Sequence, residues 1–355
     1  ETVFHIASEP MNLVILFGSV ILGIMFGAMP GLTSTLGVAL LTALTYGMGP
    51  ATAMVCLLAI YVGGTYGGSY ASILINIPGT AASAATALDG YPLACKGEGG
   101  RAIGLTTTAS AIGTIISMLF LVSISPIISF FALQFTSFEF FLLAFFGILI
   151  SGTLTSPDLV IKGWISGFLG LFMACVGREL LQFYPRVNFG IPELDSGIEV
   201  VPVLIGAFGI PQIIQVLKQR LVIGEAQKFQ RILPEFGTVL RNIPHIVRSA
   251  LIGVGIGSVP GIGEDIAAWV SYGAAKNISK HPERFGKGEY TAVLSTETAN
   301  NACVGGAMIP LLNLGIPGSP PAAMLLGALM LHGVTPGPMI TFEHPNFIIE
   351  VAAIL

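Results

Sequence analysis

The sequence predicts an all-α polytopic membrane protein with an inverted-topology repeat, helical hairpins and helices broken at Pro-Gly pairs. Three observations support this fold class. Only 15 basic and 19 acidic residues occur among 355, or 10%, whereas soluble globular domains contain about 25%. Charged residues are absent from the runs 10–88, 102–138 and 298–342. Glycine-rich motifs also recur in the two halves. An ordinary water-soluble fold is therefore excluded, because the chain lacks polar residues to cover its surface.

The first charge-free run predicts a hairpin over 12–48 and a broken span over 52–88. The hairpin's two apolar arms meet at Pro30-Gly31, and arms of this length favour a re-entrant loop over two full crossings. The following span is interrupted at Asn76-Ile-Pro78-Gly79-Thr80. Proline removes an intrahelical hydrogen bond and glycine frees the backbone. Each Pro-Gly pair therefore ends one half-helix and lets another begin at membrane depth.

Four further spans over 104–217 complete a first repeat, which we assign to residues 1–225. Their apolar segments lie near 104–125, 138–155, 161–177 and 200–217.

The basic residues predict which loops are cytoplasmic, since Lys and Arg concentrate on that side of a membrane. They cluster in 218–248 and 276–287, which we place inside. The stretch 178–199 is mostly acidic and 332–346 has no Lys or Arg, so both are placed outside.

A second repeat over 226–355 carries the same two motifs in the same order. Gly23-x3-Gly27-x2-Pro30-Gly31 is matched by Gly253-x3-Gly257-x2-Pro260-Gly261, and Asn76 to Thr80 by Gly315-Ile-Pro317-Gly318-Ser319. The connecting loops differ in charge: 45–52 is neutral where 276–289 is basic. Matched loops on opposite sides indicate the inverted repeat of many secondary transporters; chance recurrence in a glycine-rich chain is the alternative. We expect this repeat to be incomplete at Leu355.

The four breaks predict a site for a carboxylate anion. Half-helix N-termini present unpaired N–H groups and the positive end of a dipole, worth roughly 0.3–1 kcal/mol each at exposed positions. Small polar residues suited to capping follow each break. Kinks satisfied by neighbouring helices, without a ligand, are the alternative. The predicted substrate-binding residues are Pro30, Gly31, Thr33, Ser34, Thr35, Asn76, Pro78, Gly79, Thr80, Pro260, Gly261, Pro317, Gly318 and Ser319.

Acidic and amide residues within apolar surroundings predict a coupling site for Na⁺ or H⁺. Such residues are costly in a membrane and usually line an ion or substrate path, and their oxygens suit a hard cation. Helix capping by the first two and pairing of the third with a loop cation is the alternative. The predicted coupling residues are Glu264, Asp265, Glu297, Asn300 and Asn301. No cofactor other than a coupling ion is expected, and the scattered Cys and His residues predict no structural metal.

The stretch from Tyr66 through Gly-Gly-Ser-Tyr-Ala-Ser-Ile-Leu-Ile-Asn-Ile-Pro-Gly to Thr80, with Ala84 to Pro92 and Gly97, resembles the large membrane subunit of the tripartite tricarboxylate transporter family. The Pro30-Gly31, Pro260-Gly261 and Gly315 to Gly318 segments are similar to that family as well. The resemblance implies a bacterial inner membrane, a small four-span membrane subunit, and a periplasmic solute-binding protein that delivers citrate or another carboxylate.

The predicted function is cation-coupled import of a carboxylate between the two repeats. An anion channel or a structural subunit without coupled transport is the main alternative. Gly261-Ile-Gly-Glu-Asp265 comes close to the Gly-x-Gly-Asp of intramembrane aspartyl proteases, but a second mid-span Asp is missing, so no enzyme is expected. The net charge of -4 and the absence of dense basic runs predict no nucleic-acid partner.

Overall fold

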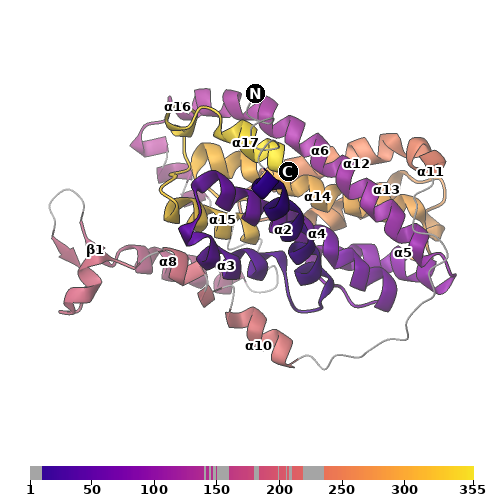
Figure 1. Ribbon diagram of the computed structural model, residues 1–355, viewed down its shortest axis with the longest axis horizontal. Coiled ribbons are helices and arrows are strands. Elements are labelled where there is room, and N and C mark those ends of the chain that lie inside the picture. The colour runs from indigo at the N-terminus through magenta and orange to yellow at the C-terminus, as the bar shows by residue number, and fades with distance from the viewer. Residues whose placement is uncertain are drawn as a thin grey trace.

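The computed structural model describes residues 10–139, 141–143, 145–146, 149, 160–179, 184–198, 200–204, 206–207, 210–218 and 236–355. This part of the chain is predominantly helical (Figure 1). Its strands are β1 (Gly177–Arg178) and β2 (Pro185–Arg186), which pair antiparallel. Within the described ranges, three helices are long and apolar enough to cross a membrane, namely α2 (Pro10–Ala28), α4 (Pro50–Ile75) and α6 (Gly99–Ala132).

Two long helices, α4 and α14 (Tyr290–Leu314), form the centre of the molecule. Every residue of α14 from Ala292 to Asn313 is buried, and most of α4 is buried too. Neither helix has a polar stripe for water, which is typical of helices surrounded by protein on all sides. By contrast, α2 and α6 expose apolar side chains such as Phe17 and Leu119, as expected for a lipid-facing surface.

Each central helix is covered by a glycine-lined helix that approaches it closely. A Cβ on Gly27 of α2 would lie 2.0 Å from the carbonyl oxygen of Gly64 in α4. In the second half, a Cβ on Gly257 of α12 (Ile243–Gly257) would lie 2.5 Å from the carbonyl oxygen of Cys303 in α14. Small residues allow such backbone contact between membrane helices. The two matched glycine motifs therefore make equivalent helix pairs.

The central helices also end in the same way. Asn76 terminates α4 with a left-handed backbone at φ 55°, and Gly315 terminates α14 at φ 70°. In each case the next amide bonds back across the last turn: Ile77 N to Ala71 O at 3.4 Å, and Ile316 N to Pro310 O at 3.3 Å. In both helices a left-handed residue ends the helix, and the amide that follows it satisfies a carbonyl of the last turn.

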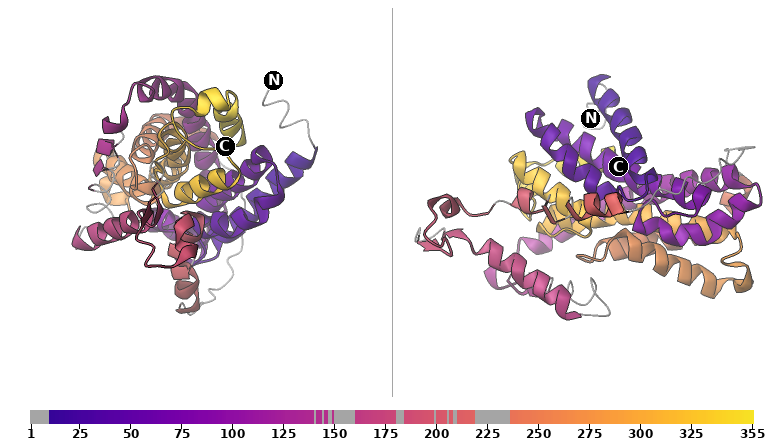
Figure 2. Two further views of the ribbon diagram at one scale, coloured as in Figure 1. Left: turned by 90° about the vertical axis from the view of Figure 1, so that its left-hand side faces the viewer. Right: turned by 90° about the horizontal axis from the view of Figure 1, so that it is seen from below.

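The remaining elements lie around or beside this centre (Figures 1 and 2). They are α3 (Ser34–Leu44), η1 (Thr45–Gly47), η2 (Ala81–Ser83), α5 (Ala84–Cys95), α8 (Val160–Ala174), η3 (Pro192–Ser196), α9 (Val200–Leu204), α10 (Ile210–Lys218), α11 (Phe236–Arg241), α13 (Gly263–Ile278), η5 (Pro282–Arg284), α15 (Pro320–Leu331), α16 (Ile340–Glu343) and α17 (Phe347–Ile354).

Several predicted spans correspond to these helices with different bounds. The span predicted at 104–125 lies within α6, and that at 161–177 corresponds to α8. Of the span predicted at 200–217, the described residues include α9 and α10, and part of the segment between them lies outside the described residues. The 138–155 span lies partly outside the described residues, and the repeat boundary at 225 lies wholly outside them. Helix α2 has 19 residues, which is long enough for a full crossing rather than a re-entrant arm.

A small polar module follows α8 and extends away from the main bundle (Figures 1 and 2). Arg178 Nη2 pairs with Asp195 Oδ2 at 2.7 Å, and Asn188 Nδ2 donates to Asp195 Oδ1 at 2.9 Å. The Asn188 and Arg178 donors lower the pKa of Asp195. These contacts hold the β1–β2 pair against η3.

Candidate functional site

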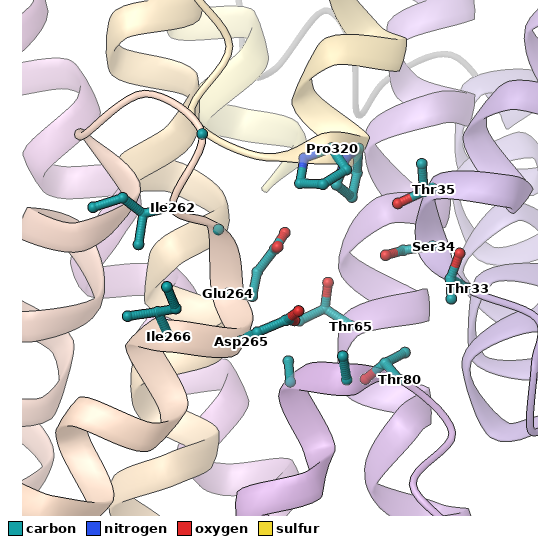
Figure 3. A pocket seen from close by; sticks show the side chains of 15 residues that line it. Thr33, Ser34, Thr35, Thr65, Thr80, Ile262, Glu264, Asp265, Ile266 and Pro320 are labelled. Carbon is teal, nitrogen blue, oxygen red and sulfur yellow. The ribbon is translucent and has the colours of Figure 1, made fainter. Parts of the chain in front are cut away.

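A cavity of about 440 Å³ lies where four helical segments begin (Figure 3). Glu264 and Asp265 of α13 lie across it from Thr33, Ser34 and Thr35 at the start of α3. Pro320 of α15 lies on the opposite side from Thr80, which precedes η2. The lining residues are Thr33, Ser34, Thr35, Thr65, Thr80, Ala81, Ala82, Gly261, Ile262, Gly263, Glu264, Asp265, Ile266, Pro320 and Pro321.

Side-chain caps start three of these segments. Thr33 Oγ1 accepts from Leu36 N at 3.3 Å, and Ser319 Oγ accepts from Ala322 N at 3.4 Å. Ser83 Oγ accepts from Thr80 N at 3.2 Å and donates to Thr80 O at 2.8 Å. Each cap satisfies only part of a first turn, which has four N–H groups without helical partners. Residues of these first turns line the cavity.

The start of α13 differs, because Ile262 at its N-cap offers no side-chain hydrogen bond. Gly261 and Gly263 adopt φ values of 79° and 77°, a region that glycine occupies at little cost. Glu264 and Asp265 follow in the first turn, where the positive end of the helix dipole favours negative charge. This wall of the cavity therefore supplies carboxyl groups as well as backbone donors.

The charge of the cavity is unusual for an anion site. Its two ionisable side chains are acidic, and the described residues that line it include no Lys, Arg or His. Backbone N–H groups, hydroxyls and helix dipoles are thus what an anion can bind here. Two carboxylates would repel that anion unless protons or cations neutralise them. The cavity is suited to taking an anion together with a cation.

Glu264 is held in place by a hydrogen-bonded triad across the two halves. Tyr61 Oη donates to Glu264 Oε1 and lies 2.7 Å from Ser319 Oγ. Tyr61 belongs to α4, whereas Ser319 is the cap of α15. Tyr61 is fully buried, so the phenol fixes the carboxyl group without exposing it to solvent. Helices of both halves therefore meet at one carboxyl group.

A second buried carboxyl group, Glu297, lies outside the cavity lining. Thr86 of α5 donates to it, Ser110 Oγ of α6 lies 3.5 Å from its Oε2, and Asn300 Nδ2 lies 3.5 Å from its Oε1. Asn301 Nδ2 donates to Ser110 Oγ at 2.8 Å. The predicted residues Glu297, Asn300 and Asn301 thus share one buried cluster.

The structure brings seven of the predicted site residues to the cavity and places twelve elsewhere. Those that line it are Thr33, Ser34, Thr35, Thr80, Gly261, Glu264 and Asp265. Those outside the lining are Pro30, Gly31, Asn76, Pro78, Gly79, Pro260, Pro317, Gly318, Ser319, Glu297, Asn300 and Asn301.

Several residues outside the lining have structural roles in ending, packing or capping helices. Asn76 ends α4 in the left-handed conformation and is exposed. A Cβ on Gly79 would lie 2.0 Å from Gly27 O, and one on Gly318 would lie 2.1 Å from Gly257 O. Ser319 bonds Tyr61 as well as capping α15. Among the lining residues that sequence analysis missed, Thr65 is the one hydroxyl; it lies within the uninterrupted apolar helix α4, where the sequence carries no local signal for a site.

Comparison with known proteins gives consistent similarities. The sequence pattern of the Tripartite tricarboxylate transporter TctA family matches residues 13–355. An uncharacterized 52.8 kDa protein in the TAR-I ttuC′ 3′ region of Agrobacterium vitis is 36% identical over 344 residues, which are 96% of this chain and 68% of that protein. A protein in the TAR-II ttuC′ 3′ region of the same organism is 44% identical over 90 residues, 25% of this chain and 37% of its own. No solved structure matches the chain.

Proposed function

Because this chain belongs to the Tripartite tricarboxylate transporter TctA family, a family of transporter components, we propose that it imports a tricarboxylate or related carboxylate across the bacterial inner membrane with Na⁺ or H⁺. The observation that carries the proposal is the cavity at four helix starts, which has N–H and hydroxyl donors, two carboxyl groups and no basic side chain in its described lining. Such a site suits an anion that arrives with cations.

Coupling also follows from the membrane potential. Each negative charge entering a cell that is negative inside faces roughly 2.3 kcal/mol per 100 mV. A di- or trivalent carboxylate therefore accumulates only with a cation. Glu264 and Asp265 at the cavity and Glu297 behind it are the proposed coupling carboxyls, with Asn300 and Asn301 beside the last. An anion channel, the alternative, would have no use for acidic groups at its binding site.

We propose that the two halves are inverted repeats that share this cavity. The equivalent glycine contacts of α2 with α4 and α12 with α14 support this, as do the matching helix ends at Asn76 and Gly315. The family's tripartite character implies partner subunits. We propose a small four-span membrane subunit and a periplasmic binding protein that delivers the carboxylate.

The test is uptake of labelled citrate and related acids into vesicles that contain the full complex, with Na⁺ and pH gradients imposed separately. Import should follow at least one gradient, and uptake indifferent to both would rule out coupling.

The anion site is tested with Thr35→Val, which removes a hydroxyl at the cavity while keeping the side-chain shape. A hydrogen bond to a charged group is worth about 1.5–3 kcal/mol, so the carboxylate concentration for half-maximal uptake should rise at least about tenfold. Thr42→Val on the same helix is the matched control, because Thr42 is buried and its hydroxyl donates to Val38 O, at 2.7 Å, within the helix. Equal effects of the two substitutions would contradict the site.

A further inference from the structure

The cluster around Glu297 has the composition of a cation site separate from the carboxylate cavity. Glu297 lies in the N-terminal half of α14, and its side chain is fully buried. Its hydroxyl partners come from two other helices, Thr86 of α5 and Ser110 of α6. The Ser69 hydroxyl of α4 lies near it and has no hydrogen-bond partner among the described residues. Four helices therefore place oxygen-bearing side chains around one carboxyl group.

The groups around this carboxyl can act as hydrogen-bond donors to its ionised form. The Thr86 hydroxyl donates to Oε1, and the Ser110 hydroxyl and Asn300 amide lie at hydrogen-bond range as further donors. A carboxylate accepts several such bonds, whereas a protonated carboxyl must itself find an acceptor. Hydrogen bonds to the charged form stabilise it. The protein thus surrounds Glu297 with donors suited to a negative charge.

This charge has no basic partner within the described part of the chain. The hydrogen-bond partners of Glu297 are hydroxyl and amide groups, and its helix has no Lys, Arg or His. Burying an unpaired charge is among the most costly arrangements in a protein. In addition, Asn301 Oδ1 is buried and accepts no hydrogen bond from the described residues. Both observations indicate a missing positive partner.

We propose that Glu297, Asn301, Ser110 and Thr86 bind a monovalent hard cation, Na⁺, at a site distinct from the carboxylate cavity. One carboxylate balances one positive charge, whereas a divalent ion would leave net charge in a buried place. Hydroxyl oxygens keep lone pairs for a cation while donating their protons to the carboxylate. The proposal deepens the coupled transport proposed above and rests on it.

The site is placed to influence the cavity through α4. Tyr61, Thr65 and Ser69 follow one another at four-residue spacing, so they lie on one face of that helix. The first bonds Glu264, the second lines the cavity and the third lies near Glu297. A cation at Glu297 that fixes this face of α4 also fixes the phenol that holds Glu264.

The experiment measures Na⁺ binding without transport. The full-length protein, purified in detergent, is unfolded thermally while NaCl replaces choline chloride at constant ionic strength, and bound ²²Na⁺ is counted in parallel. Na⁺ should raise the half-unfolding temperature by roughly 2–5 °C, because a ligand that binds only the folded state stabilises it. KCl should have a smaller effect. Glu297→Gln should abolish both the shift and the ²²Na⁺ signal.

Ser110→Ala is the milder second variant should Glu297→Gln fail to fold, and it should weaken Na⁺ binding at least fivefold. The matched control is Asn313→Ala, since Asn313 is also buried between α14 and α6, where it bonds Ser129 at 2.6 Å and Ser125 at 3.0 Å. The control should respond to Na⁺ as the wild type does. A wild-type protein indifferent to Na⁺, or a Na⁺ response that survives Glu297→Gln and Ser110→Ala, would overturn the proposal.

Citrate distinguishes this proposal from the broader one. Citrate should raise the half-unfolding temperature through the cavity, and Thr35→Val should reduce that effect while leaving ²²Na⁺ binding intact. If citrate raises the half-unfolding temperature and Na⁺ does not, only the proposed cation site is contradicted. If neither citrate nor a related carboxylate raises the half-unfolding temperature while Na⁺ still does, the proposed function is contradicted.

Discussion

At the scale of single residues, Tyr61 is the side chain that connects the two halves at the cavity. It reaches from the central helix α4 to Glu264 of α13 and to Ser319, the cap of α15. Its phenol is fully buried, so neither partner can exchange it for bulk water. The hydroxyl therefore orients the carboxyl group of Glu264 and also connects it to the start of α15.

Tyr61→Phe should reduce both transport and stability. Phenylalanine keeps the ring but leaves Glu264 and Ser319 without their buried partner, which costs about 1–3 kcal/mol. Thermal unfolding in detergent and citrate uptake in vesicles check the effect. Tyr66→Phe on the same helix is the control. The Tyr66 hydroxyl bonds the Tyr70 hydroxyl at 2.8 Å instead of bonding Glu264. Equal losses in the two variants would contradict a special role for Tyr61.

The Pro-Gly breaks predicted part of this site because their effect is local. Proline and glycine interrupt helices wherever they occur, so Thr33, Ser34 and Thr35 were identifiable as the start of a half-helix. Tyr61 and Thr65 lie within an uninterrupted apolar helix, where a tyrosine or threonine is usually packing. Their role depends on which helix lies opposite, and that is set by tertiary contacts. Likewise, the sequence around Glu297 does not show that this residue lies outside the cavity lining.

At the scale of secondary structure elements, glycine faces set how closely the helices pack. Gly23 and Gly27 of α2 face α4, and Gly253 and Gly257 of α12 face α14. The motif predicted the matched pairs, because a glycine face is a local property of the sequence.

Gly27→Ala should loosen the α2–α4 pair. The new Cβ would lie 2.0 Å from Gly64 O, and since a backbone atom cannot move aside cheaply, overpacking should cost about 1–3 kcal/mol or more. Gly18→Ala on the same helix is the control, because nothing lies within 4 Å of its Cβ position and alanine favours helix by roughly 0.5–1 kcal/mol. Thermal unfolding should separate the two variants, and similar midpoints would refute the close contact.

A carboxyl group also ties the halves together far from the cavity. Asp89 of α5 accepts hydrogen bonds from the amides of Gly286, Gly288 and Glu289 at 2.9, 2.9 and 2.7 Å, and from Tyr272 Oη at 3.1 Å. Asp89 directly follows the predicted span 52–88 in the sequence, yet its side chain is buried. The backbone donors that bury it come from a loop nearly two hundred residues away, so local pattern gave no signal.

At the scale of the whole molecule, the four breaks meet at one cavity from opposite sides. The start of α3 faces that of α13, and Thr80 lies opposite Pro320 (Figure 3). Each pair joins motifs that match in sequence, Thr35 with Asp265 and Thr80 with Ser319. Such an arrangement is expected of repeats related by an axis in the membrane plane. The matched loops of the two halves should then lie on opposite faces of the membrane.

Single cysteines at Tyr46 and Lys280, in a protein whose own four cysteines are replaced, test this orientation. Both positions are exposed and lie in the connectors that follow α3 and α13. Inversion predicts that a membrane-impermeant maleimide labels Tyr46→Cys only from the periplasmic side and Lys280→Cys only from the cytoplasmic side, because the basic connector stays inside. Right-side-out and inside-out vesicles should give reciprocal labelling, and detergent should expose both sites. Labelling of both positions from one side would place the two hairpins in the same orientation, and the shared cavity would then need another explanation.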